Sequence, residues 1–410
     1  MIENPNDQSV AKPPVTEGRV LIWMCLLIGV NQLGFGAIIP VLPLYANEFG
    51  VSQVAIGSTI AVYGLARLLS GLPSGKLADL LGRRSVLALG GVLSAAGNFW
   101  CAYASSFEGL ILARFVAGFG AGLTLTAGMI ILSDITTVAR RGRVMAIYQG
   151  VFLFAVGIGP LPGGYLAETY GLAVPFAAYG IASGLAAIVG WFGVPETRQL
   201  AQAASAGAGG SDALPYVKQL QAVLKPIGFR LVSSIGFINA VVRTGGLFAI
   251  VPIVGTTRLN LEASQIGFCM AVGSVAGLLV TYPAGVMVDR IGRKPVIVPA
   301  TLAVAVAFIV FSFALNFVWF LVATVIWGVA SSVSGAAPSA YAADISAKAH
   351  GAAAMSTYRT LADAGYVVGP IMLGLLADQY GLSFPLFLSS ALLVGVALAF
   401  ARYAPETRFN

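Results

Sequence analysis

The sequence predicts an all-α integral membrane protein with twelve transmembrane helices in two similar six-helix bundles. Of its 410 residues, 58% are hydrophobic and 10% are charged, whereas soluble proteins carry about 25% charged residues. A chain with so little polar surface requires the bilayer as its solvent. The second observation is an internal repeat at a constant offset of 210 residues, held over most of the chain. Two halves with an even number of spans each are related by a pseudo-two-fold axis along the membrane normal.

Twelve apolar stretches reach the length of about 20 residues that a helix needs to cross the hydrocarbon core. Each must be helical, because lipid offers no hydrogen-bond partners to an open backbone. We expect the spans at residues 20–43, 53–74, 85–105, 108–131, 144–166, 172–193, 228–253, 264–286, 295–315, 318–341, 352–376 and 382–403. The expected organisation is a disordered tail (1–18), an N-terminal bundle (19–193), a linker (194–227), a C-terminal bundle (228–403) and a second tail (404–410).

Basic residues predict the orientation. Most of the 23 Lys and Arg lie in the tails, in the linker, or in the loops after spans 2, 4, 8 and 10. The opposite loops carry Arg258 and the acidic residues Glu48, Glu108, Glu168, Glu262 and Asp378. We therefore expect both termini and the linker on the cytoplasmic side of a bacterial-type inner membrane.

A charged stretch bracketed by glycines follows span 2 and recurs after span 8. Gly75–Arg84 reads GKLADLLGRR, and its copy begins at Gly285. We expect a short loop whose acidic and basic groups form a charge-assisted network that clamps the cytoplasmic side shut and breaks when that side opens. Plain loop solubility is the alternative. The residues assigned to this gate are Gly75, Asp79, Gly82, Arg83, Arg84, Asp134, Gly285, Asp289, Arg293 and Asp344.

Span 5 contains a run of glycines and prolines, and span 11 repeats part of it. The glycines allow spans 5 and 8 to pack backbone to backbone, while prolines interrupt the hydrogen-bond ladder and kink the helix. The copy in span 11 should pack on span 2 in the same way. The packing or hinge residues are Gly159, Pro160, Gly163, Gly164, Gly369 and Pro370.

These motifs resemble those of the major facilitator superfamily. Gly75–Arg84 is similar to the signature loop of that family between spans 2 and 3, and Leu112–Gly122 is similar to its span-4 motif with a single arginine, here Arg114. The stretch from Gly150 to Gly164 resembles the span-5 motif of drug/proton antiporters. Residues 31–43 resemble the span-1 motif of the twelve-helix exporter branch. The resemblance implies alternating access by two rocking bundles.

Five charged residues fall inside predicted spans and away from their ends, and none has a charged counterpart 210 residues away. Charges within the membrane are costly and are functional candidates by default. The five are Arg67, Arg114, Arg243, Arg359 and Asp363. A partly desolvated acid such as Asp363 can load and release a proton. Arg359 lies one helical turn before it, so the two form either a proton-coupling site or a static ion pair.

The resemblance assigns Arg114 to proton coupling or to substrate charge, and a donor to backbone carbonyls is the alternative for this residue. Four arginines against one aspartate predict a positive cavity, which favours an anionic, zwitterionic or neutral amphiphile over a cation. Span 1 carries no acid at its motif, only Asn31 and Gln32. The predicted substrate-binding residues are Arg243, Arg67, Asn31, Gln32, Tyr63, Gln149 and Tyr358. The alternative for Arg67 is a side chain that snorkels to the cytoplasm.

The sequence has no His/Cys cluster, no G-x-S-x-G and no Walker loop, which speaks against an enzyme or an ATP-driven pump. The predicted function is proton-coupled export of a small organic molecule or drug. The alternatives are uptake or exchange of an organic anion, and a non-transporting sensor on the same scaffold. We expect a monomer whose partners are its substrate, protons and membrane lipid, with no cofactor, metal or nucleic acid.

Overall fold

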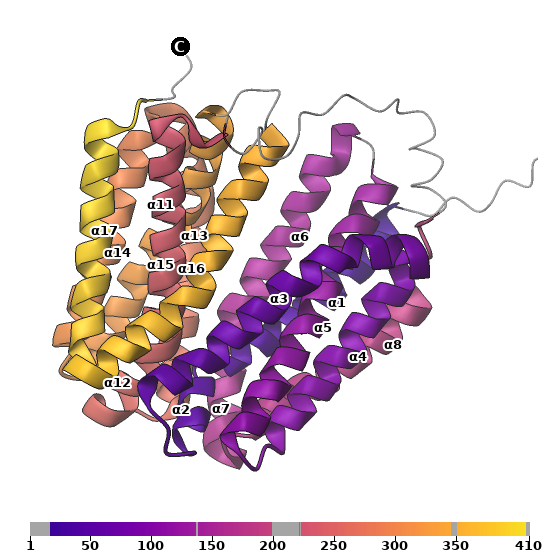
Figure 1. The fold of residues 1–410 in the computed structure, drawn as a ribbon, viewed down its shortest axis with the longest axis horizontal. Helices are drawn as coiled ribbons and strands as arrows, with labels where there is room; N and C mark the ends of the chain where they lie inside the picture. Colours follow the sequence, from indigo (N-terminus) through magenta and orange to yellow (C-terminus); the bar gives the residue numbers. More distant parts are fainter. Residues whose placement is uncertain (1–16, 137, 199–220, 222, 346–350, 407–410) are drawn as a thin grey trace, which may run out of the picture.

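The computed structural model describes residues 17–136, 138–198, 221, 223–345 and 351–406. Within these ranges, twelve helices are long and apolar enough to cross a membrane. They form two bundles that stand side by side (Figure 1). The predicted all-helical fold with twelve spans is confirmed.

The first bundle contains the helices up to Gly193. Helix α4 packs against α5 and α8, while α1 packs against α6 and α8, and α3 packs against α5. The bounds are α1 (Glu17–Ile38), α2 (Leu42–Asn47), α3 (Gln53–Leu81), α4 (Arg83–Ala102), α5 (Phe107–Ile135), α6 (Val138–Ile158), α7 (Pro160–Tyr170) and α8 (Val174–Gly193).

The second bundle repeats this packing. Helix α14 packs against α15 and α17, α13 against α15, and α11 against α16. The bounds are α11 (Ile227–Val241), the π-helix η1 (Val242–Ile250), α12 (Val251–Leu259), α13 (Ala263–Ile291), α14 (Lys294–Phe313), α15 (Phe317–Ile345), α16 (Gly351–Tyr380) and α17 (Ser383–Tyr403).

Two expected boundaries are wrong. The first span ends at Ile38 rather than at residue 43, because Pro40 cannot continue the helix, and the chain re-enters a separate short helix at Leu42. The predicted loop at Gly75–Arg84 is helical through Leu81, since its Leu and Ala residues favour a helix and nothing before Gly82 interrupts it. The turn is Gly82 alone, with φ of 96°, and Gly292 repeats it with φ of 114°. A positive φ of this kind favours glycine.

The two bundles meet where α3 crosses α16 and where α6 and α7 cross α13. Glycines bring the backbones together at these crossings: a side chain at Gly57 would collide with the carbonyl of Pro370, and one at Gly267 with the carbonyl of Pro160. Both contacts lie toward the ends of the helices remote from Gly82 and Gly292. We call the end with these contacts the closed side. The opposite end, where Gly82 and Gly292 lie, is the loop side. Figure 1 shows the bundles diverging toward the loop side.

Carboxylates from one bundle cap helices of the other on the closed side. Asp378 of α16 accepts hydrogen bonds from the backbone N–H groups of Gln53 (2.7 Å) and Val54 (2.9 Å) at the start of α3. These donors have no partner within their own helix. Glu168 bonds to the side chain and to the backbone of Ser264 at the start of α13. Because Glu168 lies 210 residues before Asp378, the closed side carries a pair of related contacts.

The glycine and proline run of span 5 separates α6 from α7 at Gly159. Gly164 lies against the carbonyl of Ala263 on α13, whereas Gly159 and Gly163 lie against the backbone of α1. The expected contact between spans 5 and 8 therefore uses only part of the motif. In span 11, the Pro370 carbonyl faces α3 and Gly369 lies against the backbone of α11.

Candidate functional site

A central cavity of about 560 Å³ lies between the two bundles. This volume falls within the range of about 300–1,000 Å³ that is usual for small-molecule sites. Its walls come from α1, α3, α5 and α6 in the first bundle and from η1 and α16 in the second. The charged and aromatic residues in the lining are Arg67, Arg243, Arg359, Asp363, Phe35, Tyr148, Phe152, Phe248 and Tyr366.

An ion pair between the bundles crosses this cavity. The Nη2 atom of Arg67 on α3 lies 3.7 Å from the Oδ1 atom of Asp363 on α16. The two side chains are 25% and 32% exposed, so water reaches both of them. The Arg67 guanidinium also lies over the ring of Tyr366, 4.9 Å from its centroid. Arg67 therefore points into the cavity, and the alternative that it reaches for the membrane surface is wrong.

The expected pairing of Asp363 with Arg359 is also wrong. Both residues line the cavity, but the ion pair described for Asp363 is with Arg67. The sequence shows that Arg359 lies one turn from Asp363, and it carries no signal for the approach of a different helix from the other bundle.

Arg114 lies behind the cavity wall. It is 1% exposed, its Nε donates to the carbonyl of Thr59 at 3.3 Å, and its guanidinium stacks over Tyr63 at 4.2 Å. Among the described residues its Nη1 atom has no hydrogen-bond partner. The structure thus matches the alternative in which Arg114 joins α5 to α3 through a backbone carbonyl, and it leaves three arginines and one aspartate in the central cavity.

Three predicted substrate-binding residues do not line the cavity. Asn31 and Gln32 are 1% and 4% exposed, and the Gln32 amide donates to the Asn31 side chain at 3.1 Å. Tyr63 is 3% exposed and stacks on Phe35. The prediction failed because α1 and α3 are apolar on all sides, so their sequences do not indicate which face turns toward the cavity.

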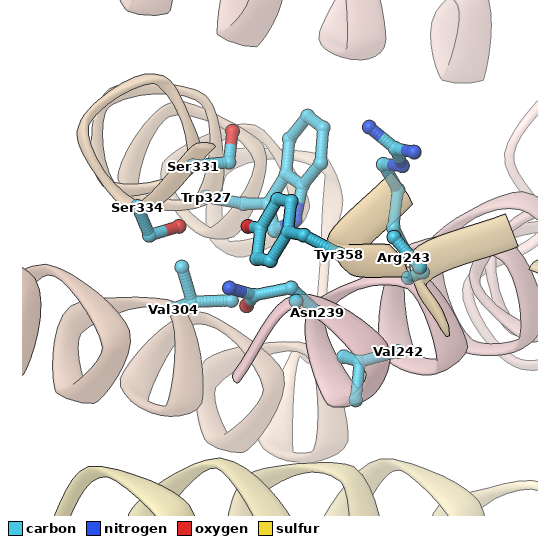
Figure 2. A pocket seen from close by; sticks show the side chains of 11 residues that line it. Asn239, Val242, Arg243, Val304, Trp327, Ser331, Ser334 and Tyr358 are labelled. Atoms are coloured by element: carbon cyan, nitrogen blue, oxygen red, sulfur yellow. The ribbon is translucent and has the colours of Figure 1, made fainter. Parts of the chain in front are cut away.

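A second cavity of about 160 Å³ lies within the second bundle. Arg243 lines both this cavity and the central one, so its side chain belongs to the walls of both. Figure 2 shows the lining side chains, with Asn239 and Ser334 pointing toward each other and Arg243 extending away from them. The predicted residue Tyr358 lies here, while Gln149 lies in the central cavity.

The π-helix η1 carries Arg243 close to its start. π-helical segments are rare and occur frequently at functional sites. Here Gly245 lies against the carbonyl of Gly369, where a larger residue would not fit. The sequence analysis missed this segment, along with the lining residues Tyr366 and Phe248. The adjacent glycines Gly245 and Gly246 were the only signal in the sequence.

The repeated charged motif forms its network within each bundle. Arg83 pairs with Asp79 (2.7 Å) and with Asp134 (3.1 Å), and Arg293 pairs with Asp344 (2.9 Å). These bonds join α3, α4 and α5 of the first bundle and α14 and α15 of the second. The side chain of Asp289 lies outside the described part of the chain.

The network was expected to clamp its side of the protein shut and to break when that side opens, and no break is seen in this conformation. The pairs are intact although the bundles diverge on the loop side. Arg84 stacks over Trp191 of its own bundle. Gly75 and Gly285 have open space where a side chain would lie.

Two helical bundles with twelve helices long and apolar enough to cross a membrane, and a cavity between them, define the class of polytopic membrane proteins. The chain belongs to the Major Facilitator Superfamily, whose sequence profile matches residues 24–238 and again 232–410. It is therefore a secondary transporter and a multi-pass membrane protein with twelve spans, as its sequence motifs indicated. Members of this family are not enzymes, and they carry small substrates.

Similar proteins cover nearly the whole chain. An uncharacterized MFS-type transporter of Methanocaldococcus jannaschii is 26% identical over 377 residues, which is 88% of this chain and 92% of the relative. Multidrug resistance protein 2 of Bacillus subtilis is 23% identical over 395 residues, covering 94% and 96%. The crystal structure of the nucleoside transporter NupG superposes with a TM-score of 0.77 at 15% identity, covering 93% and 98%, which shows a shared fold.

Proposed function

We propose that this chain exports a small organic molecule in exchange for protons, with the loop side facing the cytoplasm. The observation that carries the proposal is the ion pair between Arg67 and Asp363, which joins the two bundles across the cavity. Among the described residues, Asp363 is the only acidic one in the cavity lining. Proton binding would neutralise Asp363 and remove its attraction to Arg67, so proton loading is linked to the contact between the bundles.

The charge of the cavity supports an anionic, zwitterionic or neutral substrate. Arg67, Arg243 and Arg359 outnumber the single carboxylate of Asp363 in the lining. A permanent cation would lie among three guanidinium groups, and repulsion between like charges in a partly desolvated cavity is costly. Aromatic rings such as Tyr366 and Phe248 supply the apolar surface that an amphiphile needs. The similarity to a multidrug resistance protein is in keeping with export.

The test uses everted membrane vesicles with an acidic lumen and a fluorescent dye that reports the pH gradient. Three probes share one ring system and differ in charge: 1-naphthoate, 1-naphthol and 1-naphthylmethylammonium. Export by proton exchange predicts that the anion or the neutral probe releases protons from the lumen, and that the cation does not. The variant Asp363→Asn should abolish the release while inserting normally.

Asp378→Asn is the matched control, because it makes the same chemical change on the same helix, outside the cavity lining. It should still release protons, because it leaves Asp363 and the lining of the central cavity intact. Proton release by Asp363→Asn at the wild-type rate would refute the coupling role of Asp363. Acidification of the lumen on probe addition, in place of proton release, would reverse the direction and favour uptake.

A further inference from the structure

The cavity within the second bundle has the size and the chemistry of a separate binding subsite. We call it the side pocket, defined by Asn239, Arg243, Trp327, Ser331, Ser334 and Tyr358. Its volume is about 160 Å³, and a protein cavity of about 150 Å³ is known to hold one benzene molecule. The side pocket therefore accommodates one aromatic ring with a small substituent, and the central cavity holds the larger part of a drug-sized molecule.

Hydrogen-bond donors dominate the lining of the side pocket. The guanidinium of Arg243 and the indole N–H of Trp327 can only donate, and the amide of Asn239 adds two further N–H groups. The hydroxyl of Ser331 already donates to the carbonyl of Gly328 at 3.2 Å. No carboxylate lines this pocket among the described residues. A carboxylate ligand finds several donors here, whereas a cationic ligand finds no opposite charge.

The aromatic side chains of Trp327 and Tyr358 give the side pocket flat walls (Figure 2). Asn239 and Ser334 point toward each other from opposite sides, so a planar group between them can bond to both. Arg243 lines both the side pocket and the central cavity, so its positive charge favours an anion in either one. Flat walls, facing polar groups and a positive charge together match an aromatic carboxylate.

We propose that the side pocket binds the ring-sized, carboxylate-bearing end of the substrate, while the rest of the molecule lies in the central cavity. This inference rests on the proposed function and narrows it to an aromatic organic anion. The geometry places recognition of the anionic end entirely within the second bundle. In the part of the chain that the structure describes, the first bundle contributes Arg67 and other residues to the central cavity and none to the side pocket.

The test measures binding to the purified full-length protein in detergent, where no proton gradient exists. The probes are benzoate, benzamide and benzylammonium, which share one ring and differ in charge. Quenching of tryptophan fluorescence reports binding, and Trp327→Phe identifies the share of the signal that arises in the side pocket. We expect saturable quenching by benzoate, weaker quenching by benzamide, and none by benzylammonium.

Two substitutions remove polar groups from the side pocket. Hydrogen bonds to a charged group contribute about 1.5–3 kcal/mol, so Asn239→Ala and Ser334→Ala should each weaken benzoate binding about tenfold or more. The matched control is Ser332→Ala, on the same helix as Ser334. Ser332 lies outside the lining, and its hydroxyl donates to the Val329 carbonyl. Its affinity for benzoate should equal that of the wild type.

A nearly isosteric change guards against loss of folding. Asn239→Asp adds a negative charge with little change of shape, and it should abolish benzoate binding while creating binding of benzylammonium. Equal benzoate affinity in the wild type, Asn239→Ala and Asn239→Asp would overturn the proposal, as would an equal loss in Ser332→Ala. Benzoate binding without proton release in vesicles would refute proton exchange alone. If 1-naphthoate causes proton release but the side-pocket variants bind benzoate as tightly as the wild type, the assignment of the side pocket alone is refuted.

Discussion

The carboxylate of Asp378 should hold the closed side shut, and its removal should shift the protein toward the conformation that is open there. Asp378 belongs to the second bundle and accepts the backbone N–H groups of Gln53 and Val54 from the first. The next N–H group, of Ala55, bonds to the Ser52 hydroxyl within the first bundle. Opening the closed side separates Asp378 from α3, so two of these three donors lose their protein partner.

The size of the effect follows from the energetics of helix N-termini. Replacing an N-terminal cap by alanine costs about 1 kcal/mol, and Asp378 is exposed to solvent, so we take this moderate value. Since 1.4 kcal/mol corresponds to tenfold, Asp378→Ala should raise the ratio of open to closed conformers about fivefold. Asp378→Asn keeps one oxygen acceptor but turns an NH2 group toward the second backbone N–H, so its ratio should lie between those of the wild type and Asp378→Ala.

The assay is a distance measurement between spin labels on the closed side. Asn47 on α2 and Thr257 on α12 are exposed, and these two short helices contact each other across the two bundles. Spin labels at these two positions report the distance between the two bundles on the closed side. The three native cysteines, Cys25, Cys101 and Cys269, are first replaced so that they are not labelled. The long-distance population should increase most in Asp378→Ala and by a smaller amount in Asp378→Asn, which keeps one of the two accepting oxygens.

Two results would refute this reasoning. An unchanged distance distribution in Asp378→Ala would show that the cap does not stabilise the closed side. Equal shifts in Asp378→Ala and Asp378→Asn would show that charge, and not the bonds to the N–H groups, is responsible. Glu168→Ala, at the related contact with Ser264, should shift the population in the same direction.

Two further predictions concern packing and stability. Gly57→Ala forces a methyl group against the carbonyl of Pro370, so the spin labels on the closed side should move apart. The control is Gly71→Ala on the same helix, where no atom lies within 4 Å of the new methyl group. It should leave the distance between the labels unchanged. Arg83→Ala leaves the partly buried Asp134 without its cation, and breaking a buried pair costs about 3–5 kcal/mol. Thermal unfolding should therefore occur at a clearly lower temperature than in the wild type, whereas Arg84→Ala, which loses only a contact with Trp191, should unfold near the wild-type temperature.

Much of the architecture is readable from composition and repetition. The length of an apolar stretch reports whether a helix spans the membrane, because the hydrocarbon core excludes polar groups. The copy of Gly75–Arg84 at Gly285 reports the second bundle, because duplicated chains keep the residues on which their turns depend. Gly82 and Gly292 show this dependence through their positive φ values. These signals are local, so no knowledge of packing is needed to read them.

The site was only partly predictable. Arg67, Arg243, Arg359 and Asp363 were recognised because a charge inside the membrane is costly wherever it points, and all four line the central cavity. Asn31 and Gln32 have no such cost when they bond to each other, and their position in α1 gave no indication of the face they occupy. The lining residue Tyr366 was missed for the same reason.

By itself, the sequence determined the number of spans, the two related bundles, the family and the set of charges that the membrane must accommodate. Only the tertiary structure decided the partner of Asp363, the burial of Arg114, the π-helix at Arg243 and the caps from Asp378 and Glu168. The physical reason is that composition and helix-breaking residues show whether a segment lies in lipid or in water. A helix that is apolar on every side carries no record of which face meets a neighbour, and contacts between bundles arise from close backbone packing at glycines far apart in the chain.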